Sequence, residues 1–136
     1  MCYFLYGAVN NGINESDFNS KTENTDYHFK IGKKDDLNKC IEECRADYRI
    51  THNHCDCDSP VGGKSSDNSE LKELGKLLLD LKSVRGIKHI FISRNWIEET
   101  NTKEENVHID DIDIVSFLAN IEENCLYKIE MYSRYC

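Results

Sequence analysis

Proline and long apolar runs are scarce in this sequence, and basic residues are outnumbered by acidic ones. The single proline, Pro60, excludes Pro-rich linkers and repeats. No apolar run approaches the roughly 20 residues that a membrane-spanning helix needs, so we expect no membrane partner. The segment Met1–Tyr6 has neither a basic stretch nor a small-residue cleavage site, so it does not fit a signal peptide. We therefore expect a cytoplasmic protein.

The shortage of positive charge argues against nucleic acid as a partner. The chain has 17 Lys and Arg residues against 25 Asp and Glu residues, a formal net charge of −8. Binding to DNA or RNA depends largely on Lys and Arg that displace counterions from phosphates. The only dense basic pair, Lys33-Lys34, is followed at once by Asp35-Asp36. We expect a protein partner or a small-molecule ligand, and a homo-oligomer is left open.

The cysteines do not form the pattern of a secreted, disulfide-rich domain. There are seven of them, at positions 2, 40, 44, 55, 57, 125 and 136. An odd number with this spacing matches no disulfide framework. In a chain without an export signal, such cysteines are free thiols or metal ligands rather than structural bridges.

The residues that are present predict an α+β fold in a single domain spanning residues 1–136. Hydrophobic residues make up 39% and charged residues 31%, which is ordinary for a globular domain. Apolar runs and period-two alternation predict five strands, at 2–9, 27–31, 48–52, 87–92 and 126–135. Helical spacing predicts three helices, at 37–44, 71–81 and 112–121. The order β-β-α-β-α-β-α-β favours a mixed sheet of about five strands with two or three helices packed on it.

The ends of these helices and the segments between elements carry their own signals. Asp67 and Glu70 have the spacing of a capping box before the second helix. Asp110 or Asp111 is expected to cap the third helix, and Asp35 or Asp36 the first. The remaining polar segments predict no regular element, at residues 13–25, 59–69 and 95–106.

The run His52-Asn53-His54-Cys55-Asp56-Cys57-Asp58 packs six potential metal ligands into seven positions. In an extended chain, period two places the His and Asp residues on one face and both cysteines on the other. Imidazole and thiolate groups are ligands that zinc prefers. The predicted metal ligands are therefore His52, His54, Cys55 and Cys57, with any further ligand supplied through the fold by Cys2, His28, His89, His108 or Cys125. The alternative interpretation is a polar loop whose two thiols pack as small hydrophobes.

Cys2 is a candidate nucleophile. Removal of Met1 would leave an N-terminal cysteine, whose α-amino group, with a pKa near 8, could act as a base for the thiol. This arrangement resembles that of N-terminal nucleophile amidohydrolases. The resemblance implies a catalytic role for Cys2, whereas the alternative is simply the first residue of a strand.

Arg94, Asn95 and Trp96 form a candidate binding surface. They follow a predicted buried strand, and polar groups at a strand end often face a ligand crevice in α/β sheets. Trp and Arg are also frequent anchors of protein interfaces. The alternative is a tryptophan that covers the edge of the core.

Three functions fit these observations. The leading hypothesis is a non-catalytic binding module that recognises a protein partner or small ligand through His52–Asp58 and Arg94–Trp96. The second is a metal- or thiol-dependent enzyme that uses the His52–Asp58 cluster. The third is an acidic inhibitor that occupies the nucleic-acid-binding surface of another protein. The Asn-, Lys- and Ile-rich usage is typical of an AT-rich bacterial genome or one of its phages.

Overall fold

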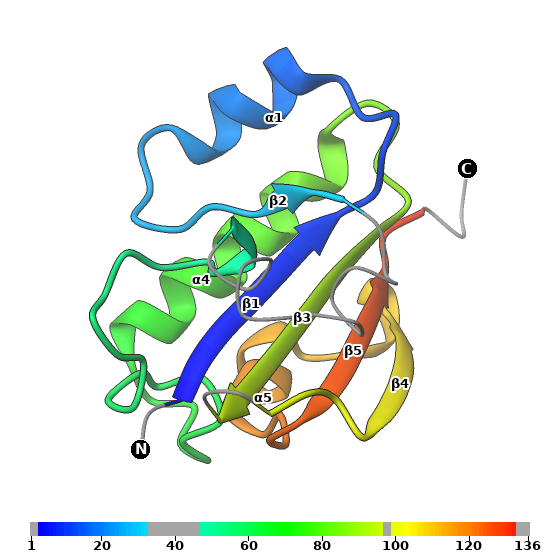
Figure 1. Cartoon of the computed structure of the whole chain (residues 1–136). Coiled ribbons are helices and arrows are strands. Elements are labelled where there is room, and N and C mark those ends of the chain that lie inside the picture. Colours follow the sequence, from blue (N-terminus) through cyan, green and yellow to red (C-terminus); the bar gives the residue numbers. More distant parts are fainter. Residues whose placement is uncertain (1–2, 33–46, 97–98, 133–136) are drawn as a thin grey trace.

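A five-stranded mixed sheet forms the centre of the computed structural model, which describes residues 3–32, 47–96 and 99–132. The strands lie in the order β2-β1-β3-β5-β4 (Figure 1). Their bounds are β1 Tyr3–Val9, β2 Lys30–Ile31, β3 His89–Trp96, β4 Lys103–His108 and β5 Cys125–Glu130. The predicted fold class, an α+β fold with a mixed sheet of five strands, is confirmed.

The topology places an antiparallel centre between two parallel margins. Strand β3 pairs antiparallel with both β1 and β5. The outer strands β2 and β4 are each parallel to their neighbour, β1 and β5 respectively. Parallel neighbours need a crossover connection, and a helix lies between the two strands in both cases.

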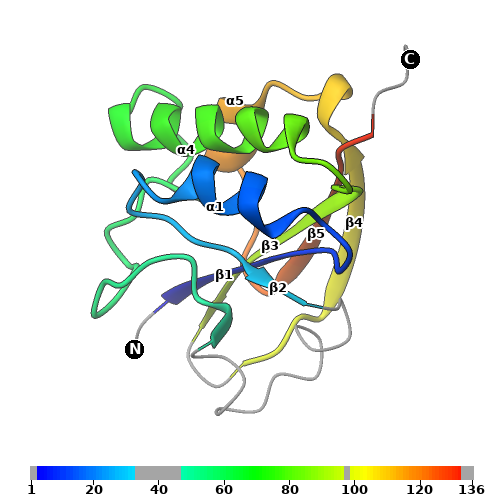
Figure 2. The same cartoon turned by 90° about the horizontal axis from the view of Figure 1, so that it is seen from above.

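The three described α-helices lie on one face of the sheet (Figure 2). They are α1 Glu15–Thr22, α4 Ser69–Asp80 and α5 Ile114–Ala119. Helix α4 buries an apolar stripe made up of Leu71, Leu74, Leu77 and Leu78. None of the helices within the described ranges is both long and apolar enough to cross a membrane.

The core has two parts, one on each side of the sheet. The larger part lies between the sheet and the helices and includes Leu5 and Val9 of β1. The smaller part, on the opposite face, contains Tyr6, Ala8, Tyr48, Phe91 and Leu126. Strand β1 is therefore buried on both faces, as its almost continuous apolar sequence predicts.

Helix α1 occupies a segment that was expected to be irregular. Asn14 caps it by accepting a hydrogen bond from the N–H of Asp17 at 3.0 Å. Phe18 is the only buried residue of this helix. A single apolar anchor produces no helical periodicity in the sequence, which is why the prediction for residues 13–25 was wrong.

Two strands also differ from the prediction. Residues 48–52 form no strand, because only an isolated bridge joins Arg49 to Tyr6. Strand β4 was missed because four of its six residues, from Lys103 to Asn106, are polar and exposed at the edge of the sheet. Edge strands that pair on one side tolerate such a sequence.

The helix caps also need correction. The N-cap of α4 is Asn68, whose side chain accepts from the N–H groups of Glu70 and Leu71. The N-cap of α5 is Asp113, because the preceding residues Ile109–Asp111 form a separate 3-10 turn. The helix expected at residues 37–44 lies outside the described residues.

Candidate functional site

The segment 49–57 runs along the outer edge of β1 without forming a strand. Strand β2 pairs only with the C-terminal end of β1, at Ala8 and Val9. Beside the N-terminal half, the N–H of Ile50 donates to the carbonyl of Leu5, and the N–H of Asp56 donates to the carbonyl of Tyr3, each at 3.0 Å. This segment therefore replaces a strand along half of the edge.

Asp56 completes the edge with its side chain. The carboxylate is buried and accepts hydrogen bonds from the N–H of Leu5 at 2.9 Å and the hydroxyl of Thr51 at 2.5 Å. Arg49 pairs with the same carboxylate at 3.2 Å. A buried carboxylate is stable only when it is paired and hydrogen-bonded, and these three donors meet that need. Asp56 is therefore a structural residue that stands in for a main-chain acceptor.

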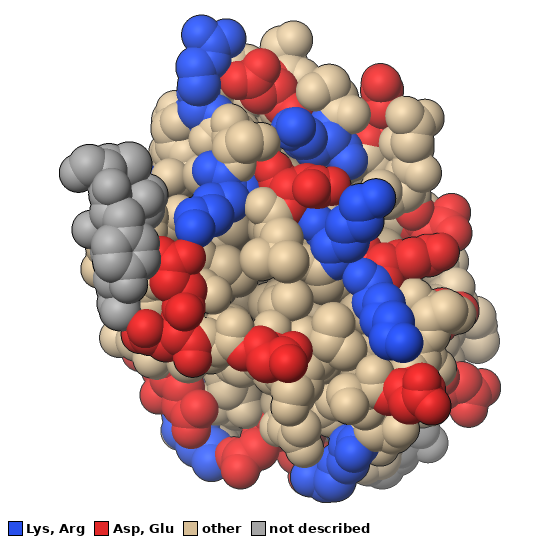
Figure 3. Space-filling view, turned by 180° about the vertical axis from the view of Figure 1, so that it is seen from behind, with Lys and Arg blue, Asp and Glu red and all other residues tan. Residues whose placement is uncertain are grey.

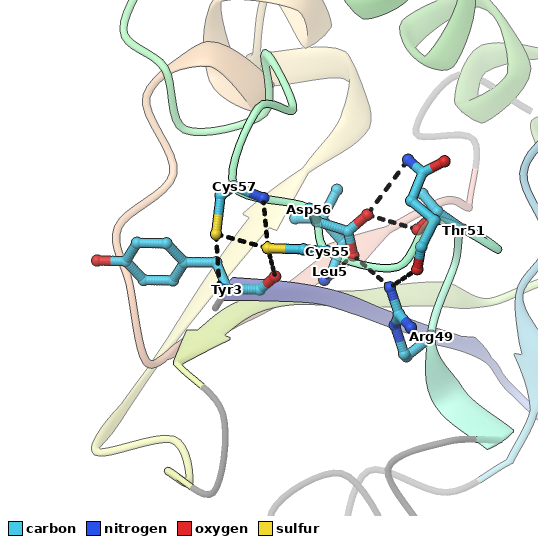
Figure 4. A network of polar contacts seen from close by, with 8 residues as sticks. Tyr3, Leu5, Arg49, Thr51, Cys55, Asp56 and Cys57 are labelled. Atoms are coloured by element: carbon cyan, nitrogen blue, oxygen red, sulfur yellow. Dashed lines mark hydrogen bonds and ion pairs between the residues drawn. The ribbon is translucent and has the colours of Figure 1, made fainter. Parts of the chain in front are cut away.

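Cys55 and Cys57 project away from this carboxylate and meet each other. Their sulfur atoms are 2.7 Å apart (Figure 4). The N–H of Tyr3 donates to the sulfur of Cys57 at 3.3 Å, and the N–H of Cys57 donates to the sulfur of Cys55 at 3.4 Å. Cys57 is exposed and Cys55 is half-buried. Both thiols thus lie on one side of the chain, at the start of the turn formed by residues 57 and 58.

A cleft of about 670 Å³ opens beside this segment, and we call it the α1–α4 cleft. Its walls are the C-terminal end of α1, residues 25–28, the N-terminal end of α4, and residues 51–53, 55, 58 and 59. Five carboxylates line it, and none of its described lining residues is Lys or Arg; the acidic residues are Glu23, Asp26, Asp58, Glu70 and Glu73. A surface hollow with this lining concentrates negative potential.

Two histidines stack within the same cleft. The rings of His28 and His52 have centroids 4.4 Å apart and an interplanar angle of 27°. Burial lowers the pKa of His28 below its ordinary value, with smaller contributions from His52 and Arg49. Burial also raises the pKa of Tyr27, and the carboxylates of Glu70 and Glu73 add to that rise. The cleft therefore combines imidazole, phenol and carboxylate groups.

The four predicted metal ligands do not converge on one point. His52 and Cys55 line the cleft and Cys57 contacts Cys55, whereas His54 is exposed and does not line the cleft. Among the described residues, no group of three or more His, Cys, Asp or Glu side chains is arranged to hold a metal ion. His28, one of the residues expected to complete such a site, does lie beside His52. Zinc binding stays a prediction.

Arg94 and Trp96 point to the same face of the sheet and pack on Tyr3. The guanidinium carbon of Arg94 is 3.7 Å from the centroid of the Tyr3 ring, and the Trp96 and Tyr3 ring centroids are 3.5 Å apart. Asn95 is buried and donates to the side chain of Asn101 at 3.0 Å. The three predicted binding residues therefore do not share one face.

Tyr3 connects the two regions that the leading hypothesis combines, His52–Asp58 and Arg94–Trp96. Its backbone N–H contacts Cys57, while its ring contacts Arg94 and Trp96. Its hydroxyl donates to Glu123, and burial, followed by this hydrogen bond, raises the pKa of Tyr3 to about 12. No sequence signal marked Tyr3, because its role depends on pairing between distant strands. The candidate nucleophile Cys2 lies outside the described residues.

On the face of the molecule seen from behind, Lys and Arg are interspersed with Asp and Glu, without a broad basic area (Figure 3). Comparison of this chain with protein families, with curated proteins and with solved structures found no match. The α1–α4 cleft and the segment beside it are therefore the features of the molecule that bear on its function.

Proposed function

We propose that this chain is a cytoplasmic, non-catalytic binding protein whose α1–α4 cleft accepts a primary ammonium or guanidinium group. The single observation that carries the proposal is the cleft of about 670 Å³, lined by five carboxylates and by no described Lys or Arg. Its volume lies within the range of roughly 300–1,000 Å³ that is typical of small-molecule sites. A cation is the group that this lining would favour.

The arrangement of the lining also gives the site two kinds of contact. Glu70 and Glu73 project from the first turns of α4, while Asp26 and Asp58 lie on the loops opposite. Carboxylates on more than one wall could contact several N–H groups of one cation. The stacked rings of His28 and His52 add an aromatic surface that the carbon chain next to the charge can contact.

Two sources could supply such a group: a free polyamine, or a Lys or Arg side chain of a protein partner. Isothermal titration calorimetry with spermidine and with a Lys/Arg-rich peptide distinguishes them. Both titrations should be made at low ionic strength and at about 0.15 M, because exposed charges are screened over roughly 8 Å there. Tighter binding of spermidine would support a small ligand, and tighter binding of the peptide would support a protein partner.

A charge-matched pair of variants tests the location. Glu70→Gln with Glu73→Gln should weaken binding at least about fivefold at low ionic strength, because two carboxylates leave the cleft. Glu104→Gln with Glu105→Gln removes the same charge from β4, at the other margin of the sheet, and should change the affinity less than about twofold. Equal weakening by both pairs, or no binding of either probe at millimolar concentration, would contradict the proposal.

A further inference from the structure

We propose that Cys55 and Cys57 form a redox-active dithiol that reacts with external disulfides by thiol–disulfide exchange. This inference is independent of the cation site, although Cys55 lies on the wall of the α1–α4 cleft. It depends on the geometry of the two sulfur atoms, on what holds them in place, and on their difference in exposure.

The first observation is the short distance between the sulfur atoms. Their separation of 2.7 Å is about 0.7 Å longer than a disulfide bond of about 2.05 Å. The two cysteines are separated by one residue, so closing this gap is a local rearrangement of segment 55–57.

The second observation is that the backbone around the pair is fixed on both sides. Asp56, between the two cysteines, has a buried carboxylate held by Leu5, Thr51 and Arg49, and its N–H donates to the carbonyl of Tyr3. The sulfur of Cys57 accepts the N–H of Tyr3. A sulfur in a disulfide can still accept this hydrogen bond, so oxidation does not require the edge of β1 to open.

The third observation is the unequal exposure of the two thiols, which assigns their roles. The exposed thiolate of Cys57 attacks one sulfur of an external disulfide, forms a mixed disulfide and releases one thiol. The half-buried thiolate of Cys55 then attacks the sulfur of Cys57, breaks the mixed disulfide and releases the second thiol. The protein dithiol loses two electrons and two protons, and the external disulfide becomes two thiols.

The product is expected to be a labile disulfide rather than a structural one. A Cys-x-Cys bridge closes a very small ring, and one of its sulfurs is exposed. Strained or exposed disulfides are easily reduced, and they are the regulatory or catalytic ones. The pair is therefore expected to cycle between dithiol and disulfide as the surrounding thiol pool changes.

The experiment uses the full chain equilibrated with mixtures of glutathione and glutathione disulfide, followed by alkylation, trypsin digestion and mass spectrometry. Cleavage after Arg49 and Lys64 gives one peptide that contains Cys55 and Cys57 and no other cysteine. Its internal disulfide is read as the loss of two hydrogens. Cys40 with Cys44, and Cys125, fall on separate peptides and serve as internal references.

The expected result is an equilibrium constant for the Cys55–Cys57 disulfide that is at least about tenfold larger in the folded chain than in the urea-unfolded chain, because folding fixes the two thiols side by side. An equal or smaller constant in the folded chain would overturn the proposal. This comparison uses the wild-type sequence, so it does not depend on the folding of any variant.

Two single variants test the assigned roles. Cys55→Ser should accumulate the mixed disulfide of Cys57 with glutathione, because no second thiol remains to resolve it. Cys57→Ser should react at least about threefold more slowly than Cys55→Ser, because the remaining thiol is less exposed. If the wild-type protein accumulates as much mixed disulfide as Cys55→Ser, Cys55 does not resolve it and the proposal is wrong.

Discussion

The outer edge of β1 is completed in two different ways along its length. At the C-terminal end, β2 pairs with Ala8 and Val9 through the main chain alone. At the N-terminal half, the acceptors of the Leu5 and Tyr3 N–H groups are the side chains of Asp56 and Cys57. Main-chain pairing leaves side chains free to vary, whereas side-chain pairing requires particular residues. The N-terminal half of the edge is therefore the part whose sequence is constrained, and the candidate site lies beside it.

The way in which the N-terminal half of this edge is completed also explains why Asp56, one residue of the apparent metal-binding motif, has a structural role. Asp56 reads in the sequence as one ligand among six, yet its carboxylate is fully engaged with the edge of β1. Its burial turns Cys55 and Cys57 outward, where they contact each other. The residue that stabilises the segment thus positions the residues that are available for chemistry.

The largest expected effect comes from removing the buried carboxylate. Asp56→Ala should lower the free energy of unfolding by about 3 kcal/mol, because it leaves Arg49, Thr51 and the Leu5 N–H without their acceptor. Urea denaturation measures this change. Asp58→Ala removes an exposed neighbouring carboxylate and should change the free energy by no more than about 0.5 kcal/mol. A loss below about 1 kcal/mol for Asp56→Ala would show that the side-chain half of the edge contributes little.

Gly7 lies where the two halves of the edge meet, and its replacement should have the next largest effect. A Cβ atom there would lie 2.6 Å from both Ile50 and Phe29. Gly7→Ala should therefore destabilise the protein by about 2 kcal/mol through overpacking, as measured by urea denaturation. In Gly75→Ala the new Cβ meets its nearest neighbours, Ile114 and Val115, at 3.2 Å, and a change of less than about 1 kcal/mol is expected. Similar losses in both variants would contradict the close packing at Gly7.

Replacement of Cys57 should have a smaller effect on the free energy of unfolding than replacement of Asp56, at the same edge. Cys57→Ala removes the sulfur that accepts the N–H of Tyr3, and one neutral hydrogen bond contributes about 1 kcal/mol or less. The loss in free energy of unfolding should therefore be clearly smaller than that of Asp56→Ala. If the two losses were equal, the sulfur and the buried carboxylate would stabilise the edge equally, and the ranking proposed here would be wrong.

The smallest effect concerns the pH dependence of stability rather than its value at neutral pH. Burial lowers the pKa of His28 below its ordinary 6.5, so the unfolded chain binds a proton more readily than the folded chain. The free energy of unfolding therefore decreases as the pH falls from about 6.5 toward the lowered pKa. His28→Gln should make this decrease smaller. Urea denaturation at a series of pH values measures the change, and an unchanged slope in His28→Gln would contradict the burial of that imidazole.

The parts of the fold that could be predicted are those with strong apolar patterns. The continuous apolar run of β1 and the leucine stripe of α4 each bury a regular set of side chains, and both elements are present. Helix α1 was missed because Phe18 is its single anchor, and β4 was missed because most of its side chains are exposed. Weak burial leaves weak periodicity, so the sequence carried little signal for either element.

The candidate site likewise has residues that could be predicted from the sequence and residues that could not. His52, Cys55 and Cys57 could be found because they are neighbours in the sequence. The acidic walls of the cleft could not, because Glu23 and Glu73 are brought together only when α1 packs beside α4. Tyr3 joins the thiols to Arg94 and Trp96 through strand pairing, which no local pattern encodes.

Amide hydrogen exchange tests most directly whether side chains complete the edge of β1. In the wild-type chain, the amide protons of Leu5, which donates to Asp56, and of Gly32, which donates to the carbonyl of Val9, should both be protected. In Asp56→Ala the Leu5 amide should lose protection by at least about tenfold relative to Gly32, because the side chain at position 56 no longer offers an acceptor. Equal protection of the two amides in wild type and variant would contradict the account.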